Sequence, residues 1–373
     1  MLSYRLSGIM AAAMMTAVSV TAAEIGDADP YASIDRRPFG VHPAFAFGQT
    51  GDPYGPARDA GIAWTRGADA PYVFWALVDP FRTRDPRQMR FAGTTTGPDG
   101  EPLRFDYDAS ISKALASGLS VMWNIAVEPA PWGYSAPASW LPTDQGAYKS
   151  FVQATIKRYP GIRVWQVGNE PDIQLGFPPE PRLADFAALQ RLTCQAIKQV
   201  DPRVVVVMGG AADWSLGYFD EVLDDLNGRC VDVFDFHLYG DPKGGTLMPR
   251  PLPPLGYLHI ERLARSIRGH LDARGFTRTR IWSTECGTFS GTVGLGGPDT
   301  MTASEAEQAR DLVKRYVVAL ANGVEKIFWA FGISEGLGPW EASDYFDHTG
   351  LIYTGPGAPR GTRKLGYWAL WQR

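Results

Sequence analysis

The sequence has few of the residues that build metal centres and disulfide-stapled folds. It contains three cysteines and five histidines in 373 residues, with neither Cys-x-x-Cys nor His-Glu-x-x-His spacing. Those spacings are typical of zinc sites, so we expect no metal and no other cofactor. Because Cys194, Cys230 and Cys286 are few and widely spaced, the fold is expected to depend on its core. The pattern leaves a Cys194 to Cys230 bridge open.

The chain also lacks an excess of positive charge and, beyond its first residues, a long hydrophobic run. Its 36 basic and 40 acidic residues give a net charge of −4. Neutralising a phosphate backbone needs clustered lysine and arginine, so no nucleic-acid partner is expected. The 12 tryptophans and 15 tyrosines indicate flat apolar faces instead, suited to core packing or to stacking on sugar rings.

The first 23 residues form a separate segment. They carry one charge, Arg5, then an apolar stretch over 9–18 and the small residues Thr21, Ala22 and Ala23. This pattern predicts a secretory signal peptide cleaved near Ala22 or Ala23. An uncleaved anchor is the alternative, but the run is shorter than the ~20 residues that a spanning helix needs. We therefore expect residues 24–373 to form one domain, without a membrane span, in a secreted or periplasmic and monomeric protein.

From residue 38 the sequence alternates short apolar runs with amphipathic segments, which is typical of β/α units. The predicted strands are 39–47, 62–67, 119–126, 163–168, 203–209, 231–238, 280–285 and 326–331. Helices are predicted over 183–200, from 258 to 271, from a capping box at Thr302 and Glu305 to 320, and over 366–371. Eight strands and no second core favour a closed (β/α)8 (TIM) barrel of class α/β. An open doubly wound sheet is the alternative, but no Gly-x-Gly-x-x-Gly follows an early strand.

The lengths of the connections separate the two ends of this barrel. The links from helix to strand are short: 159–161, 201–202 and 322–323. The links from strand to helix are long and rich in glycine, proline and aromatic residues: 68–104, 127–143, 239–257, 286–301 and 332–363. All strand-to-helix loops lie on one face of such a barrel, so a binding cleft is expected there. Residues 82–104 are predicted to form a hairpin or lid.

Two glutamates end predicted strands on that face. Glu170 follows the fourth strand in Val-Gly-Asn-Glu-Pro, and Glu285 ends the seventh in Trp-Ser-Thr-Glu. Strands four and seven face each other across a closed barrel, so both carboxylates can enter one cleft. Either glutamate alone is explained by a salt bridge or a cap. A pair about 5 to 5.5 Å apart defines a retaining glycosidase, with one acid/base and one nucleophile.

These two strand ends resemble clan A of the glycoside hydrolases, with features of families 39, 79 and 5. The resemblance implies that Glu170 is the acid/base, that Glu285 is the nucleophile, and that Asn169 binds the sugar 2-hydroxyl. It departs from family 39 in having Val-Gly-Asn-Glu instead of Trp-Asn-Glu-Pro. The third strand ends in Met122-Trp123-Asn124, where many clan members carry a histidine.

Other substrate-binding positions are assigned by the same resemblance. Arg66, at the end of the second strand, is similar to the arginine that keeps the nucleophile ionised, although a surface charge is the alternative. His237 and Tyr239 close the sixth strand, and Tyr239 is expected to donate to Glu285. Trp329 resembles the tryptophan that floors the sugar site; barrel packing explains it equally well. The loop tryptophans Trp75 and Trp132 are candidate stacking platforms.

The expected activity is double-displacement hydrolysis of a β-linked oligosaccharide or polysaccharide. Long loops and many tryptophans favour several subsites and endo action, although long loops also build the blind pockets of exo-acting enzymes. A non-catalytic carbohydrate-binding or polysaccharide-export barrel, which would bind without turnover, and a transglycosylase are the alternatives.

Overall fold

The structure is a computed structural model that describes residues 29–42, 52, 54–67, 72–96, 102–127, 141–172, 183–212, 216–240, 257–294, 300–335, 345–354 and 358–371. Eight parallel strands form its centre. They are β1 (Phe39–Val41), β2 (Trp64–Arg66), β6 (Ser120–Ala126), β7 (Val164–Val167), β8 (Val205–Met208), β9 (Val233–Tyr239), β10 (Arg280–Gly287) and β13 (Val324–Trp329). Because β1 pairs with both β2 and β13, and β2 pairs with β6, the sheet closes into the predicted barrel.

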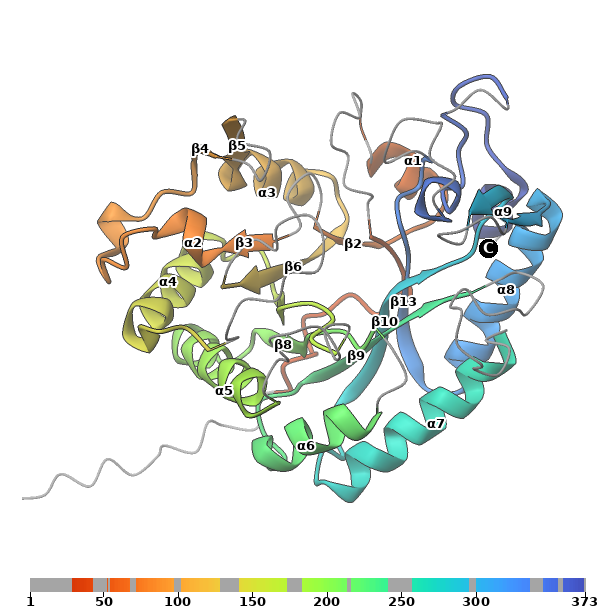
Figure 1. Ribbon diagram of the computed structural model, residues 1–373. Helices are drawn as coiled ribbons and strands as arrows, with labels where there is room; N and C mark the ends of the chain where they lie inside the picture. Colours follow the sequence, from red (N-terminus) through yellow and green to blue (C-terminus); the bar gives the residue numbers. More distant parts are fainter. Residues whose placement is uncertain are drawn as a thin grey trace, which may run out of the picture.

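Helices surround the strands on the outside, and α4 to α8 follow one another around the barrel in sequence order (Figure 1). The helices are α1 (Tyr54–Asp59), α2 (Trp75–Val78), α3 (Tyr107–Ala116), α4 (Gln145–Arg158), α5 (Leu183–Val200), α6 (Leu216–Leu226), α7 (Tyr257–Ala273), α8 (Glu305–Ala321) and α9 (Leu365–Trp371). Two short 3-10 helices, η1 (Pro86–Gln88) and η2 (Tyr345–His348), lie in the connections. Among the described helices, none is long and apolar enough to cross a membrane.

The core has two layers because successive strand residues point to opposite sides. One layer fills the inside of the barrel and includes Trp64, Met122, Val164, Val207, Trp282 and Phe328. The other layer lies between the strands and the helices and includes Trp123, Trp165, Phe234 and Trp329. The alternation decides which strand residues can reach a cleft at the barrel mouth.

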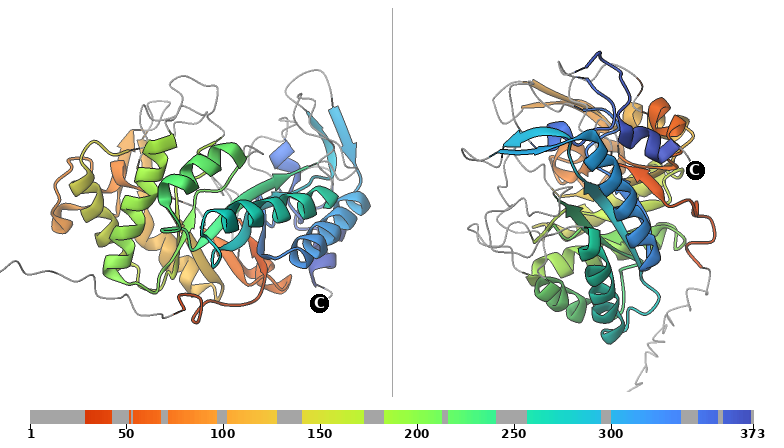
Figure 2. Two further views of the ribbon diagram at one scale, coloured as in Figure 1. Left: turned by 90° about the horizontal axis from the view of Figure 1, so that it is seen from below. Right: turned by 90° about the vertical axis from the view of Figure 1, so that its right-hand side faces the viewer.

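The capping box of α8 differs from the predicted one. Ser304 is the N-cap residue: its hydroxyl accepts from the backbone N–H of Glu307, and the Glu307 side chain accepts from the Ser304 N–H. The predicted pair, Thr302 and Glu305, lies two residues too early, because Thr302 belongs to β12 (Thr300–Ala303). That strand pairs with β11 (Gly291–Gly294), and their hairpin extends away from the barrel (Figure 2).

The segment after β2 is more ordered than a single long loop. It contains β3 (Tyr72–Phe74), which pairs with the end of β6 where β2 stops. It also contains the hairpin of β4 (Ala92–Thr96) and β5 (Pro102–Asp106), which confirms a hairpin in this region. Whether the hairpin acts as a lid stays a prediction.

The disulfide that the sequence left open is present. Cys194 of α5 is bonded to Cys230, which follows α6, while Cys286 is a buried free thiol. The bridge therefore links two neighbouring helical segments on the outside of the barrel.

Candidate active site

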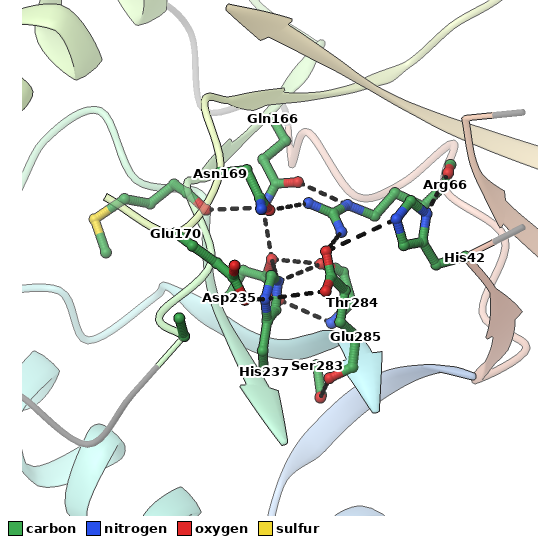
Figure 3. A network of polar contacts seen from close by, with 12 residues as sticks. His42, Arg66, Gln166, Asn169, Glu170, Asp235, His237, Ser283, Thr284 and Glu285 are labelled. Atoms are coloured by element: carbon green, nitrogen blue, oxygen red, sulfur yellow. Dashed lines mark hydrogen bonds and ion pairs between the residues drawn. The ribbon is translucent and has the colours of Figure 1, made fainter. Parts of the chain in front are cut away.

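Polar side chains gather where the barrel strands end (Figure 3). Glu170 follows β7, Glu285 lies in β10, Arg66 ends β2, and His237 and Tyr239 end β9. Glu170 has a φ of 43°, in the left-handed region that non-glycine residues rarely adopt. Such strain persists only where the surrounding structure enforces it, and it is common at functional positions.

Glu285 is held by donors on both of its oxygens. Arg66 donates to Oε1 from Nη1, and the Tyr239 hydroxyl donates to Oε2 at 2.7 Å. His42 Nε2 lies 3.8 Å from Oε1, and the Glu285 side chain is only 4% exposed. Burial would raise the pKa of Glu285, but the charges of His237 and Arg66 outweigh it and lower that pKa to about 2. The carboxylate is therefore ionised and oriented, as a nucleophile must be.

Glu170 lies close to this carboxylate but in a different environment. One oxygen of Glu170, one of Glu285 and a ring nitrogen of His237 all lie within 4.8 Å of one another. Burial and the negative charge of Glu285 raise the pKa of Glu170, although His237 opposes them. The pKa values of two neighbouring carboxyls are thus displaced in opposite directions, as an acid/base and a nucleophile require.

His237 lies between three carboxylates. Its Nδ1 is 2.6 Å from Glu170 Oε1 and 3.5 Å from Glu285 Oε2, and its Nε2 is 3.4 Å from Asp235 Oδ2. Burial alone would lower the pKa of His237, but Glu285, Asp235 and Glu170 raise it to about 10. Gly210, next to β8, leaves room for this ring, because a Cβ there would collide with His237 and Asp235.

The charges around this cluster bear on whether it can bind a metal. His237, Glu170 and Glu285 present three potential ligand atoms. The Arg66 guanidinium donates to Glu285, so a positive charge already lies where a divalent cation would have to bind. The donor set therefore fits proton transfer better than it fits a divalent cation.

Arg66 connects the two strand-end motifs. Its Nε donates to Gln166 Oε1 at 2.9 Å, and its Nη2 donates to Asn169 Oδ1 at 2.5 Å. The side chain is fully buried, so the surface-charge alternative for Arg66 is wrong. Because Arg66 contacts both Asn169 and Glu285, it fixes these two side chains relative to each other.

The tryptophans are placed differently from the prediction. Trp329 points outward: its ring contacts Tyr316 of α8, and its Nε1 donates to Thr349 O at 2.9 Å. Trp75 is 1% exposed and packs between Tyr148 and the Arg82 guanidinium. Neither ring has a face open to a sugar, so both are corrected to packing residues. Trp132 lies outside the described residues.

An aromatic residue that the sequence did not single out, Phe331, lies at the site where the two tryptophans were expected. Phe331, two residues beyond the end of β13, stacks on Tyr239 with ring centroids 6.0 Å apart and an interplanar angle of 9°. It also contacts His42 at 5.1 Å and is partly exposed. Phe331 therefore lies against His42 and Tyr239, the two rings next to Glu285.

Several supporting polar residues were also missed. Asp235 accepts from the Thr284 backbone N–H at 2.8 Å and from Gln166 Nε2 at 2.5 Å (Figure 3). His42 Nδ1 lies 2.9 Å from the carbonyl oxygen of Arg66. A usable signal was present, since each is a polar residue within or directly after an otherwise apolar strand.

Comparisons with known proteins give a fold and no family. No protein-family model matches this sequence, and no curated protein matches it. A glucosidase from Croceicoccus marinus superposes with a TM-score of 0.63 at 17% identity, covering 90% of this chain and 66% of the other. A family 39 glycoside hydrolase from Bacteroides cellulosilyticus WH2 superposes with a TM-score of 0.57 at 19% identity, covering 90% of this chain and 63% of the other. A monomeric β-xylosidase from Caulobacter crescentus superposes with a TM-score of 0.55 at 19% identity, covering 85% of this chain and 62% of the other.

The chain thus spans less than two thirds of the length of these solved proteins. At such identities the likeness establishes the (β/α)8 fold alone.

Proposed function

We propose that this protein is a retaining glycoside hydrolase of clan A, nearest to family 39, with Glu170 as acid/base and Glu285 as nucleophile. The observation that carries the proposal is the closeness of the two carboxylates, with an oxygen of each within 4.8 Å. Retaining enzymes have their carboxyls about 5 to 5.5 Å apart, whereas inverting enzymes need about 6.5 to 9.5 Å to admit a water. The likeness in fold to a glucosidase and a β-xylosidase supports the same assignment.

The reaction proceeds in two displacements. The ionised Glu285 attacks the anomeric carbon while Glu170 gives its proton to the departing glycosidic oxygen, so a glycosyl ester forms on Glu285 and the aglycone leaves. Glu170 then takes a proton from water, and the resulting hydroxide breaks the ester. The sugar is released with its original anomeric configuration, and both glutamates return to their starting states.

The electrostatics of the site support this cycle. Arg66 and Tyr239 stabilise the negative charge of Glu285 before attack. Burial, together with the same negative charge, raises the pKa of Glu170 and so favours its protonated form. When Glu285 becomes an ester its charge disappears, so the pKa of Glu170 falls and Glu170 becomes the base that the second step needs.

The substrate we propose is a β-linked glycan cleaved within its chain. The long strand-to-helix connections and the abundance of aromatic residues support several subsites. The test is to digest a set of β-1,4 and β-1,3 glucans and xylans and separate the products early in the reaction. Oligomers of mixed length support endo action, and release of monosaccharide alone contradicts it.

We further propose that the protein is exported. The N-terminal segment has the pattern of a signal peptide. The Cys194 to Cys230 disulfide supports the same compartment, because such bridges persist in oxidising surroundings. Mass determination of the mature protein from a secreting host tests this, and an intact N-terminus in the cytoplasmic fraction contradicts it.

The catalytic assignment is tested with Glu285→Ala and Glu170→Ala. Loss of a positioned acid/base costs about 10²- to 10⁴-fold in rate, and loss of the nucleophile removes the covalent route altogether. Turnover of an aryl β-glycoside is the measurement. Azide should rescue Glu285→Ala with formation of the glycosyl azide of opposite anomeric configuration, because it attacks from the vacated face.

The matched control is Glu261→Ala, which removes a partly exposed glutamate that pairs with Arg265 on the surface of α7. This variant should keep wild-type turnover. Wild-type turnover in either Glu285→Ala or Glu170→Ala would overturn the assignment. The first-formed product anomer, followed by NMR, separates retention from inversion.

A further inference from the structure

A buried amide faces the site from a strand that the proposed mechanism does not use. Asn124 lies in β6, between Trp123 and Ile125 of the layer under the helices. Met122, two residues earlier, belongs to the cluster inside the barrel. Because strand residues alternate, Asn124 points inward as Met122 does, but nearer the end of the strand where the site lies.

The neighbours of Asn124 place it beside the catalytic groups. Its register partner on β7 is Gln166, whose side chain contacts Arg66. Its register partner on the other side is Tyr72 of β3. Burial raises the pKa of Tyr72, and the charges of Arg66, Glu285 and Glu170 also act on it. Through Gln166 and Tyr72, Asn124 therefore lies beside the side chains that surround the two carboxylates.

Asn124 is 1% exposed, and by geometry neither Oδ1 nor Nδ2 makes a hydrogen bond to any residue that the structure describes. The Tyr72 hydroxyl lies close enough for the amide to lower its pKa, but it does not saturate the donors and acceptors of the amide. Leaving a buried donor or acceptor unsatisfied costs about 1 to 3 kcal/mol, so native proteins rarely leave both atoms of one amide unpaired. By contrast, the inward-facing amide of Gln166 is bonded through both of its atoms. An amide left unpaired at this place is suited to bind a ligand.

We propose that Asn124 is a specificity-determining residue whose amide binds two neighbouring hydroxyls of the sugar, with Tyr72 beside it as a further polar contact. Adjacent ring hydroxyls can present one donor and one acceptor together, which complements the acceptor Oδ1 and donor Nδ2 of an amide. The substrate class is thus a glycoside whose reacting sugar has a free vicinal diol in addition to the hydroxyl expected at Asn169. This inference rests on the proposed function, because it assumes that a sugar binds beside Glu170 and Glu285.

The Asn124 amide should discriminate strongly between a sugar and its deoxy analogue. A site built to hydrogen-bond a hydroxyl rejects an analogue that lacks it, because the buried amide is then left unpaired. An apolar pocket could not discriminate a hydroxyl in this way. The effect should appear with the sugar itself and should not depend on the leaving group.

Binding of thioglycosides tests the inference without relying on turnover. The probes are 4-nitrophenyl 1-thio-β-D-glucopyranoside, -galactopyranoside and -xylopyranoside, together with the 2-, 3- and 4-deoxy analogues of the tightest binder. Affinities for the wild type, Asn124→Ala, Asn124→Leu and Tyr72→Phe are measured by calorimetry. We expect two neighbouring deoxy analogues to bind the wild type about tenfold or more weakly than the parent. The Asn124 variants should bind the parent thioglycoside as weakly as the wild type binds those two deoxy analogues. They should no longer discriminate between the parent and the two analogues.

Additive effects would overturn the inference. If Asn124→Ala weakens the parent and every deoxy analogue by the same factor, or if no thioglycoside binds the wild type more tightly than the variant, Asn124 does not read hydroxyls. The matched control is Gln190→Leu, which alters a buried amide of α5 and should leave the discrimination unchanged. Thermal unfolding shows whether each variant is folded, and Tyr72→Phe provides a second test because it removes one hydroxyl from a partly exposed side chain.

Hydrolysis of the corresponding oxygen glycosides by the wild type is measured separately. Discriminating binding without hydrolysis overturns the proposed function and leaves the role of Asn124 standing. Hydrolysis by an enzyme whose discrimination among the probes does not depend on Asn124 supports the proposed function and overturns the role of Asn124.

Discussion

At the residue scale, the site depends on one guanidinium. Arg66 contacts Glu285, Asn169 and Gln166 through three different nitrogens while being fully buried. A buried arginine is stable only when its donors are matched, and its planar fork can join a carboxylate and two amides at once. It combines an electrostatic role at Glu285, the proposed nucleophile, with a positioning role at Asn169.

Arg66→Met should move the acid limb of activity. The pKa of Glu285 is lowered to about 2, so its ionised form is lost only as the pH falls toward that value. Removing a neighbouring positive charge raises the pKa, so the acid limb of kcat/KM should move upward by about one pH unit or more. The measurement is kcat/KM on an aryl β-glycoside between pH 3 and 9.

The alkaline limb of that profile should be less affected, because burial is the main cause that raises the pKa of Glu170. Arg87→Met, which removes an arginine that is 89% exposed, serves as the control and should leave the whole profile in place. An unchanged acid limb in Arg66→Met would contradict the electrostatic role of Arg66.

At the element scale, a buried ion pair joins three segments beside the mouth of the barrel. Lys364 directly precedes α9, and its Nζ contacts Glu335 after β13 and Ser290 Oγ after β10 at 2.8 Å. Burial lowers the pKa of Lys364 and raises that of Glu335, while the charge of each partner opposes the shift of the other. The contact links the connections that follow β10 and β13 to the start of α9.

Lys364→Met should be strongly destabilising. It removes the cation that contacts the buried carboxylate of Glu335, which is 2% exposed. Breaking a buried pair by removing one partner costs about 3 to 5 kcal/mol, which urea unfolding at pH 7 measures.

Replacing both partners, as in Lys364→Met with Glu335→Leu, should recover most of this loss. Arg265→Met, which breaks an exposed pair with Glu261, should cost less than about 1 kcal/mol. If the buried and the exposed variant lose the same stability, the pair does not hold these segments together.

At the scale of the whole molecule, stability comes from the two-layered core with one covalent link added. The disulfide spans a sequence separation of 36 residues and joins α5 to the segment after α6. Cys230 precedes β9, and the site residues His237 and Tyr239 lie at the opposite end of that strand. Its loss should therefore change stability more than chemistry.

Cys194→Ala with Cys230→Ala should lower the free energy of unfolding by about 3 to 4 kcal/mol in the chain-entropy model for a loop of this length. Urea unfolding with and without reductant is the measurement. Reductant should destabilise the wild type to a similar extent and leave the double variant unchanged. Equal stability of the oxidised wild type and the double variant would show that the bridge does not constrain the unfolded chain.

The strands were predictable because each of the eight is a short apolar run, and their parallel pairing follows from the helices between them. The side of a strand on which a residue lies was not predictable. Trp329 was a candidate floor of the site, yet its neighbour Phe328 faces inward and Trp329 packs on α8. A shift of one residue reverses the facing of every side chain in a strand. Short elements inside the connections, such as β3 and α2, carry too few residues for a periodic signal.

The sequence by itself determined the eight β/α units, the face that carries the long connections, and the two glutamates at strand ends. These features are local, because they depend on runs, spacings and turn residues a few positions apart. Only the tertiary structure decided which polar side chains meet. Arg66 and Glu285 are 219 residues apart, and His237 finds three carboxylates only where the strands converge. Barrel closure and strand register set those distances, and through burial and neighbouring charge they set the opposed pKa shifts of Glu170 and Glu285.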